Sequence, residues 1–179
     1  MGLFEAIYGR RSVRRFLDRD VEDEKIVKIL DAARWAPSGG NIQPWRFIVV
    51  KDKKLVKAIK AFSPGMFGEP PVVIVVCSDR EEAYRKGGEQ GRNYMSIVDC
   101  ALAVENMVLA AYALGLGSCI IKSFNAEAIR EILDIPEHVV PELLVSIGYS
   151  AEKPVPPPRK ELKDIVFLNR YGQRWNILG

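Results

Sequence analysis

The sequence predicts a single domain in which strands and helices pack around one buried central helix. Its 179 residues suffice for one domain with a sizeable core, and its 48% hydrophobic and 27% charged content is ordinary for a globular protein. Residues 93–114 form a stretch that is apolar on every side of a helix and must therefore be covered all round. Runs of β-branched residues, such as 72–77, predict strands. With no internal repeat or boundary in view, we treat 1–179 as one domain.

The central stretch has roughly the length that crosses a bilayer, so a membrane span is its first alternative interpretation. Asp99, Glu105 and Asn106 lie inside the stretch, however, and its flanks carry no membrane anchors. The favoured interpretation is a helix between a sheet and a second helical layer. A chain this short most easily obtains that layer by pairing with a copy of itself. The helix therefore predicts a homodimer and no membrane partner.

The amino-terminal half predicts helices and strands in alternation. Residues 23–35 have apolar side chains near one face and acidic residues at the start, and Pro37 follows their end. Two loops rich in Gly and Pro, 37–44 and 63–71, separate the elements. The run VVIVVC is apolar on both faces and predicts an interior strand. The predicted elements in order are helix 23–35, strand 46–51, helix 53–62 and strand 72–77.

The carboxy-terminal half begins with a polar segment, 79–92, whose three glycines predict a mobile connection able to act as a lid. After the central helix, Gly115 and Gly117 suit a left-handed helix cap. Prolines at 154–158 force an extended arm, and the apolar run 165–168 beyond it could pair with a distant sheet edge. The other predicted elements are strand 118–121, helix 125–133 and strand 143–149.

Charge and cysteine content exclude several classes of partner. The net charge of +3 is too small to imply nucleic acid by itself. Cys77, Cys100 and Cys119 contain no CxxC pair, and His138 is the single histidine, so neither a metal site nor a disulfide framework is expected. The amino terminus has no secretion signal pattern. We expect a protein of the reducing cytoplasm.

An arginine cluster near the amino terminus predicts an anion site. Arg10, Arg11, Ser12, Arg14 and Arg15 can aim several guanidinium groups and a hydroxyl at one anion, and phosphate is the natural match. A solvated basic turn is the plain alternative. Nucleic acid is a weaker one, because no aromatic residues are interleaved for stacking.

The loop from Pro37 to Trp45 is a second candidate site. Its two prolines and two glycines make a stiff loop, and the amides of Asn41 and Gln43 offer hydrogen bonds that suit a planar heterocycle. In a purely structural interpretation, Pro44 and Trp45 start the next strand and fill the core.

Together these motifs resemble the FMN-dependent nitroreductase family. The features are RRSVR from Arg10 to Arg14, PSGGNIQPW from Pro37 to Trp45, an apolar helix ending LGLG, and an arginine in a proline arm. The match spans nearly the whole chain, and the order and spacing of the motifs are more specific than any one of them. The resemblance implies an α+β fold with a central, mostly antiparallel sheet flanked by helices. It also implies a homodimer that exchanges carboxy-terminal arms and holds two FMN sites at its interface.

The resemblance also assigns roles to residues, by position. Arg14 would lie near the ribityl and pyrimidine side of the flavin. The residues implied to hold the FMN phosphate are Arg10, Arg11, Ser12 and Arg159. Those implied to approach from the partner chain are Pro37, Ser38, Gly39 and Asn41, with Gln43 of the same loop also counted as cofactor-binding. Those implied to run along the ring are Ile120, Ile121, Lys122 and Ser123.

One departure affects the catalytic assignment. Many relatives have a Pro and then an acidic residue followed by Gly, where this chain has Ile120, Lys122 and Ser123. A carboxylate role is therefore excluded, and the backbone N–H of Lys122 is expected to reach the flavin N5. Arg14 and this N–H are the implied catalytic groups.

The implied activity is transfer of electrons from NADH or NADPH, through FMN, to a nitroaromatic, a quinone or a similar small acceptor in two half-reactions. The flavin supplies the chemistry and the protein supplies orientation and electrostatics. Reductive dehalogenation or flavin fragmentation on the same scaffold is one alternative, and a non-enzymatic FMN-binding module is another. Because segment 79–92 is shorter than in larger relatives, the acceptor stays open.

Overall fold

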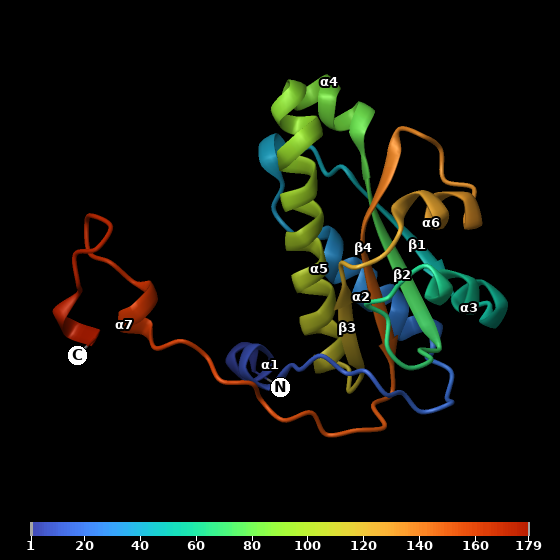
Figure 1. Ribbon diagram of the computed structural model, residues 1–179, viewed down its shortest axis with the longest axis horizontal. Coiled ribbons are helices and arrows are strands. Elements are labelled where there is room, and N and C mark those ends of the chain that lie inside the picture. Colours follow the sequence, from blue (N-terminus) through green and yellow to red (C-terminus); the bar gives the residue numbers. More distant parts are fainter. Residues whose placement is uncertain (1, 179) are drawn as a thin grey trace.

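The computed structural model describes residues 2–178 and shows helices on both faces of one antiparallel sheet (Figure 1). The strand order is β1-β2-β4-β3. The α-helices are α1 (Leu3–Gly9), α2 (Asp23–Arg34), α3 (Lys53–Ala61), α4 (Arg80–Gln90), α5 (Ser96–Ala113), α6 (Ala126–Ile132) and α7 (Leu162–Ile165). The strands are β1 (Trp45–Val50), β2 (Val72–Asp79), β3 (Gly117–Ile121) and β4 (Val139–Gly148). Single turns are η1 (Gly39–Asn41), η2 (Gly91–Met95) and η3 (Asn176–Leu178).

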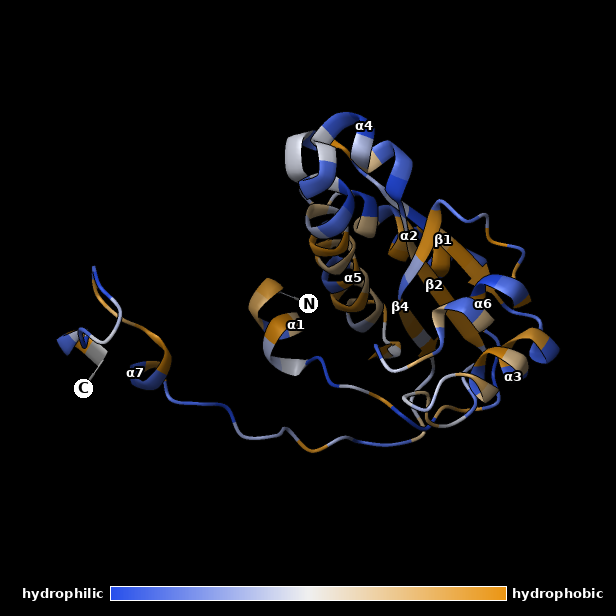
Figure 2. Cartoon of the chain, turned by 45° about the horizontal axis from the view of Figure 1, so that its top comes forward, coloured by the Kyte–Doolittle hydropathy of each residue, from blue (hydrophilic) through white to orange (hydrophobic). Residues whose placement is uncertain are grey.

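The sheet separates two hydrophobic cores because successive strand residues point to opposite faces. Alternate residues of β2, including Val72 and Ile74, pack with α2 and α5. The intervening residues, including Val73 and Val75, pack with α3 and α6. Figure 2 shows the apolar strands in orange between these layers. All of β2 is buried, so the predicted interior strand is confirmed.

Most predicted elements agree with the structure to within one residue, but β4 begins four residues earlier than predicted. Pro141 lies in this extra part, and a proline normally argues against a central strand. A register shift between Val76 and Cys77 of β2 places Pro141 opposite Cys77 and Leu143 opposite Val76. The bulge accommodates the proline, which strand patterning alone did not predict.

The central helix was correctly predicted, although its first turns are irregular. A π-helical turn, η2, joins α4 to α5 into one helical segment, 80–113, which is kinked at Gly88. By length and composition alone, part of this segment is apolar and long enough to cross a membrane. One face of α5 packs instead on the sheet and α2. The opposite face exposes Ile97, Val98 and Leu102, and Tyr94 of η2 is exposed just before them. Covering this face with a second chain remains a prediction.

The prediction of a mobile connection at 79–92 was wrong. These residues form helix α4, whose first turn is capped by the Asp79 carboxylate, which accepts a hydrogen bond from the Glu82 N–H at 2.9 Å. Lys86 pairs with Glu82 one turn away at 2.8 Å. Capping and ion pairing outweigh the glycines, of which only Gly88 leaves the helical conformation, with φ of 60°.

The carboxy-terminal arm leaves the folded body (Figure 1). Residues 154–161 contain no helix or strand, as the prolines predict. The apolar run 165–168 does not pair with the sheet of its own chain. It forms the end of α7 and an isolated bridge from Phe167 to Arg174. Apolar residues of the arm, including Ile165, are exposed in the single chain.

Candidate functional site

The arginine cluster is an extended segment laid along the outer edge of β3. Ser12 forms a parallel bridge with Ser118, and the Val13 N–H donates to the Ser118 carbonyl at 2.9 Å. Val13 is buried against Gly117, where an added Cβ would lie 2.7 Å from a Val13 methyl group. Because side chains of an extended segment alternate in direction, burying Val13 turns Ser12 and Arg14 outward.

The proline arm runs past this cluster, and the two segments line a cavity of about 270 Å³. Arg159 of the arm lines it together with four of the five predicted residues of the cluster, whereas the fifth, Arg15, does not line it. The structure therefore brings together residues almost 150 positions apart in the chain, as the phosphate assignment requires. The lining residues are Arg10, Arg11, Ser12, Arg14, Pro154, Val155, Pro157 and Arg159.

Two guanidinium groups of this cavity have unused donors. The Nε atoms of Arg10 and Arg11 are buried and have no hydrogen-bond acceptor within residues 2–178. Arg10 Nε lies 3.7 Å from a carboxylate oxygen of Glu105, which is too long for a hydrogen bond. A buried donor without an acceptor costs about 1–3 kcal/mol. An anion with several oxygens, such as a phosphate, fits these donors.

Glu152 holds the backbone at Arg14 and was not predicted as a site residue. Its carboxylate accepts hydrogen bonds from the Arg14 N–H at 2.6 Å and the Arg15 N–H at 3.1 Å, and it pairs with Arg15 Nε at 3.2 Å. The Arg14 N–H, with smaller contributions from Arg15, lowers the pKa of Glu152. The sequence signal that could have identified Glu152 was its position as an acidic residue just before the proline arm.

Arg14 and the end of β3 flank one loop, 63–71. The carbonyl oxygen of Arg14 lies against Gly68, and the Gly65 N–H donates to the Ser123 carbonyl at 3.0 Å. The Arg14 guanidinium carbon lies 5.9 Å from the centre of the Phe67 ring, which is exposed and was not predicted as a site residue. Along the predicted ring-facing stretch, Ile121 is buried, Ile120 is half-buried, and Lys122 and Ser123 are exposed.

The loop from Pro37 to Trp45, called the amide loop below, is ordered by hydrogen bonds among its own residues. Ser38 Oγ accepts a hydrogen bond from the Gln43 N–H at 3.0 Å, and Gln43 Nε2 donates to Asn41 Oδ1 at 3.1 Å. Asn41 and Gln43 adopt φ of 54° and 55°, a conformation in which asparagine is among the better tolerated residues. Trp45 is buried in the core, as its structural interpretation predicts.

Asp99 of α5 anchors this loop to the central helix. The Gly39 N–H donates to both carboxylate oxygens of Asp99, at 3.2 and 3.3 Å. Burial raises the pKa of Asp99, and the Gly39 N–H partly offsets that increase. An acidic residue inside an otherwise apolar helix was the sequence signal for this contact.

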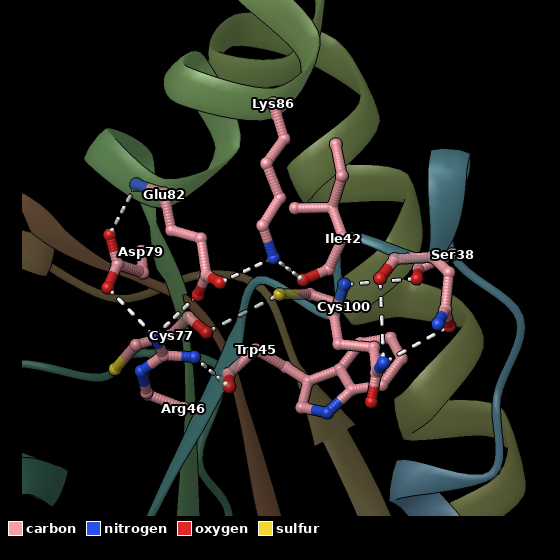
Figure 3. Close-up of polar contacts among 11 residues, drawn as sticks. Ser38, Ile42, Trp45, Arg46, Cys77, Asp79, Glu82, Lys86 and Cys100 are labelled. Carbon is pink, nitrogen blue, oxygen red and sulfur yellow. Dashed lines mark hydrogen bonds and ion pairs between the residues drawn. The ribbon is translucent and has the colours of Figure 1, made fainter.

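A chain of ion pairs ties the same loop to α4 (Figure 3). The Arg46 guanidinium contacts Asp79 at 2.9 Å and Glu82 at 2.7 Å. Lys86 bonds to Glu82 at 2.8 Å and donates to the Ile42 carbonyl at 3.4 Å. Lys86, and then Arg46, lower the pKa of Glu82. The loop is thus held from α4 as well as from α5.

Within one chain, the arginine cluster and the amide loop lie at opposite ends of α5. The loop is bound at Asp99, whereas the chain entering the cluster packs at Gly9 against Tyr112. Asp99 and Tyr112 are about 20 Å apart along the helix axis, at 1.5 Å per residue. The two predicted halves of the site therefore do not meet in a single chain.

Known proteins are similar to this chain in sequence and in fold. A sequence model described as the nitroreductase family matches residues 7–66 and 57–149. The chain is 39% identical over 160 residues to a "Putative NADH dehydrogenase/NAD(P)H nitroreductase" of Methanothermobacter thermautotrophicus, covering 86% of this chain and 80% of that protein.

Solved structures agree with these sequence matches. A nitroreductase family protein of Streptococcus pneumoniae superposes with a TM-score of 0.85 at 25% identity, covering 94% of this chain and 100% of that one. An "FMN-dependent Nitroreductase" of Clostridium difficile gives a TM-score of 0.80 at 31% identity, covering 94% and 100%. The predicted α+β fold is confirmed, and exchange of arms between chains remains a prediction.

Proposed function

The chain belongs to the nitroreductase family and is an oxidoreductase, and we propose that it uses bound FMN to transfer electrons from NADH or NADPH to a small acceptor. A nitroaromatic or a quinone is the proposed class of acceptor. The observation that carries this proposal is the cavity in which Arg159 joins the arginine cluster around two buried, unused guanidinium donors. The names of the Methanothermobacter and Clostridium relatives support the donor and the cofactor, respectively.

The cavity fits the phosphate end of FMN. Arg10, Arg11 and Arg159 offer charge-assisted hydrogen bonds, and the Ser12 hydroxyl adds a neutral donor. Pro154 and Pro157 of the arm also line the cavity. A terminal phosphate, which FMN has and FAD lacks, matches this arginine pocket, so FMN is the favoured flavin.

When bound, FMN would supply the hydride and electron chemistry. The chain would supply a fixed positive charge through Arg14, whose backbone Glu152 holds, near the ribityl and pyrimidine side of the flavin. A guanidinium set in place before the reaction stabilises developing negative charge without reorganisation. The backbone N–H of Lys122, at the end of β3, is proposed to orient the flavin N5.

The site is proposed to use two chains in a homodimer. The amide loop is about 20 Å along α5 from the arginine cluster, so a copy packed antiparallel along α5 would supply its loop to this cluster. The exposed apolar face of α5, with Ile97 and Leu102, offers the surface for that copy. The cysteines are all free and buried, which fits our proposal of a reducing cytoplasm.

Two measurements test this function. Denaturing the purified protein and identifying the released flavin decides between FMN, FAD and none. Steady-state oxidation of NADH and NADPH, with nitroaromatics, quinones and halogenated aromatics as acceptors, then measures turnover. FMN release with acceptor-dependent turnover supports the proposal. Bound FMN without turnover would indicate a binding module, and turnover only with halogenated acceptors would indicate a dehalogenase.

A further inference from the structure

A second cavity, the α3 pocket, lies between α3, residues 15–18 and residues 68–71, and its volume is about 550 Å³. That volume is within the range of small-molecule sites. None of its lining residues lines the cavity assigned to the FMN phosphate. Arg14 faces the phosphate cavity and Arg15 lines the α3 pocket, as alternation along the extended segment predicts. The two cavities thus lie on either side of the segment that contains Arg14 and Arg15, and each could hold a separate ligand.

The rim of the α3 pocket is cationic. Lys53, Lys57 and Lys60 recur at helical spacing along one face of α3, and Arg15 faces them from the neighbouring segment. Arg15 is paired with Glu152 at 3.2 Å, and among the other charged residues that line the cavity three lysines exceed two acidic side chains. Within residues 2–178, Lys57 makes no ion pair.

The two acidic residues neutralise their lysines only weakly. Asp18 lies 3.2 Å from Lys53, and both side chains are more than three-quarters exposed. Glu69 lies 4.0 Å from Lys60, at the limit of an ion pair. Exposed pairs of this kind contribute little and are readily replaced. A ligand anion could therefore recruit these lysines together with Lys57.

The floor of the pocket is apolar and rigid. It is formed by Phe16, Leu17, Val56, Pro70 and Pro71. Val56 and Pro70 are buried, and the two prolines restrict the wall. A row of lysines that is merely solvated has no need of a concave apolar surface beside it. The combination calls for a ligand with an apolar body and a negative head.

We propose that the α3 pocket binds a small organic anion, whose phosphate or carboxylate meets Lys57 and its neighbours while its apolar body lies on Leu17 and Pro70. Binding of this anion to the α3 pocket would require neither turnover of the enzyme nor contact with the flavin site. Isothermal titration of the protein saturated with FMN tests it, with 1-naphthyl phosphate and 1-naphthoate as probes. Inorganic phosphate and 1-naphthol test the two halves of the ligand separately.

We expect at least one naphthyl anion to bind, and inorganic phosphate and 1-naphthol each to bind about tenfold more weakly or not at all. Lys57→Glu should weaken the anion about tenfold, and Lys57→Gln should weaken it in the same direction by less. Leu17→Ser should weaken the naphthyl anion while inorganic phosphate binding stays unchanged. Lys28→Glu, at an exposed lysine of α2, is the matched control and should leave binding within twofold of the parent.

Three outcomes would overturn the proposal. The first is no binding of either naphthyl anion to the FMN-saturated protein. The second is displacement of FMN by the probe, which would place it in the phosphate cavity. The third is equal weakening by Lys57→Glu and Lys28→Glu, which would show attraction to general surface charge and not to the pocket.

Discussion

Among individual residues, Arg10 and Arg11 stand out because their buried Nε atoms are donors that a bound phosphate would satisfy. We predict that Arg10→Ala and Arg159→Ala each weaken FMN binding by roughly 1.5 to 3 kcal/mol, the scale of a hydrogen bond to a charged group. Fluorescence titration of the flavin-free protein measures the loss. Arg19→Ala is the control, because that guanidinium contacts Glu22 and the Tyr149 ring. Unchanged FMN affinity in both variants would refute the phosphate assignment.

Alanine substitutions of Arg14 and Lys122 are predicted to have very different effects on flavin reduction. Reduction places negative charge on the N1 and O2 side of a flavin, so Arg14→Ala should lower the flavin potential and slow reduction by NAD(P)H even at saturating FMN. Lys122→Ala should leave reduction nearly intact, because only its backbone N–H is invoked. Redox titration and stopped-flow reduction compare the two variants. An unaltered potential in Arg14→Ala, or a severe defect in Lys122→Ala, would mean that these roles are wrongly assigned.

Between elements, Asp99 links α5 to the amide loop, and the stability of this link depends on pH. Burial raises the pKa of Asp99 above the ordinary value near 4, so the native state binds this proton more tightly than the unfolded chain does. The stability that Asp99 contributes is therefore present at low pH and is lost as pH rises through its raised pKa. Asp99→Asn keeps an acceptor for the Gly39 N–H and removes the titration.

We predict that Asp99→Asn gains stability relative to the parent as pH rises from about 4 towards neutrality. Urea unfolding at several pH values measures the difference in free energy. Asp31→Asn, at an exposed residue of α2, is the control and should show no such trend. A difference between parent and Asp99→Asn that stays constant with pH would contradict a pKa raised by burial at Asp99.

Across the molecule as a whole, three uncovered apolar surfaces call for a second chain. They lie on α1 at Phe4, on α5 at Leu102 and on the arm at Ile165, all exposed in the single chain. We predict that deleting residues from Ile165 onward weakens the homodimer and releases FMN together, because the proposed site is shared. Light scattering after gel filtration, with flavin content per chain, measures both.

The double variant Lys163→Ala and Asp164→Ala controls for a general effect of altering the arm and should keep dimer and flavin. A deletion variant that is monomeric and still binds FMN tightly would rule out the shared site.

Local signals in the amino-acid sequence were enough to predict several elements and the family. Asp52 and Asn125 cap α3 and α6 through carboxylate and amide oxygens that accept from nearby backbone N–H groups, as capping patterns predict. The run VVIVVC in β2 is apolar on both faces, so an interior strand could be predicted without knowing its neighbours. The motifs around Arg10 and Asn41 pointed to the family before any contact was known. Within each cap, strand or motif the informative residues lie close together in the chain, and the order and spacing of the motifs then indicated the family.

The contacts that hold the site, in contrast, depend on how the chain folds. Glu152 bonds to the Arg14 N–H across 138 residues, and Asp99 reaches Gly39 across 60. Arg46 of β1 adds support to helix α4 by pairing with Glu82 across 36 residues. The spacing of residues along the sequence does not predict such partners, because a hydrogen bond forms between any donor and acceptor that the fold brings within about 3 Å. The chain order sets which residues are available, and the packing of the sheet and α5 decides which of them meet.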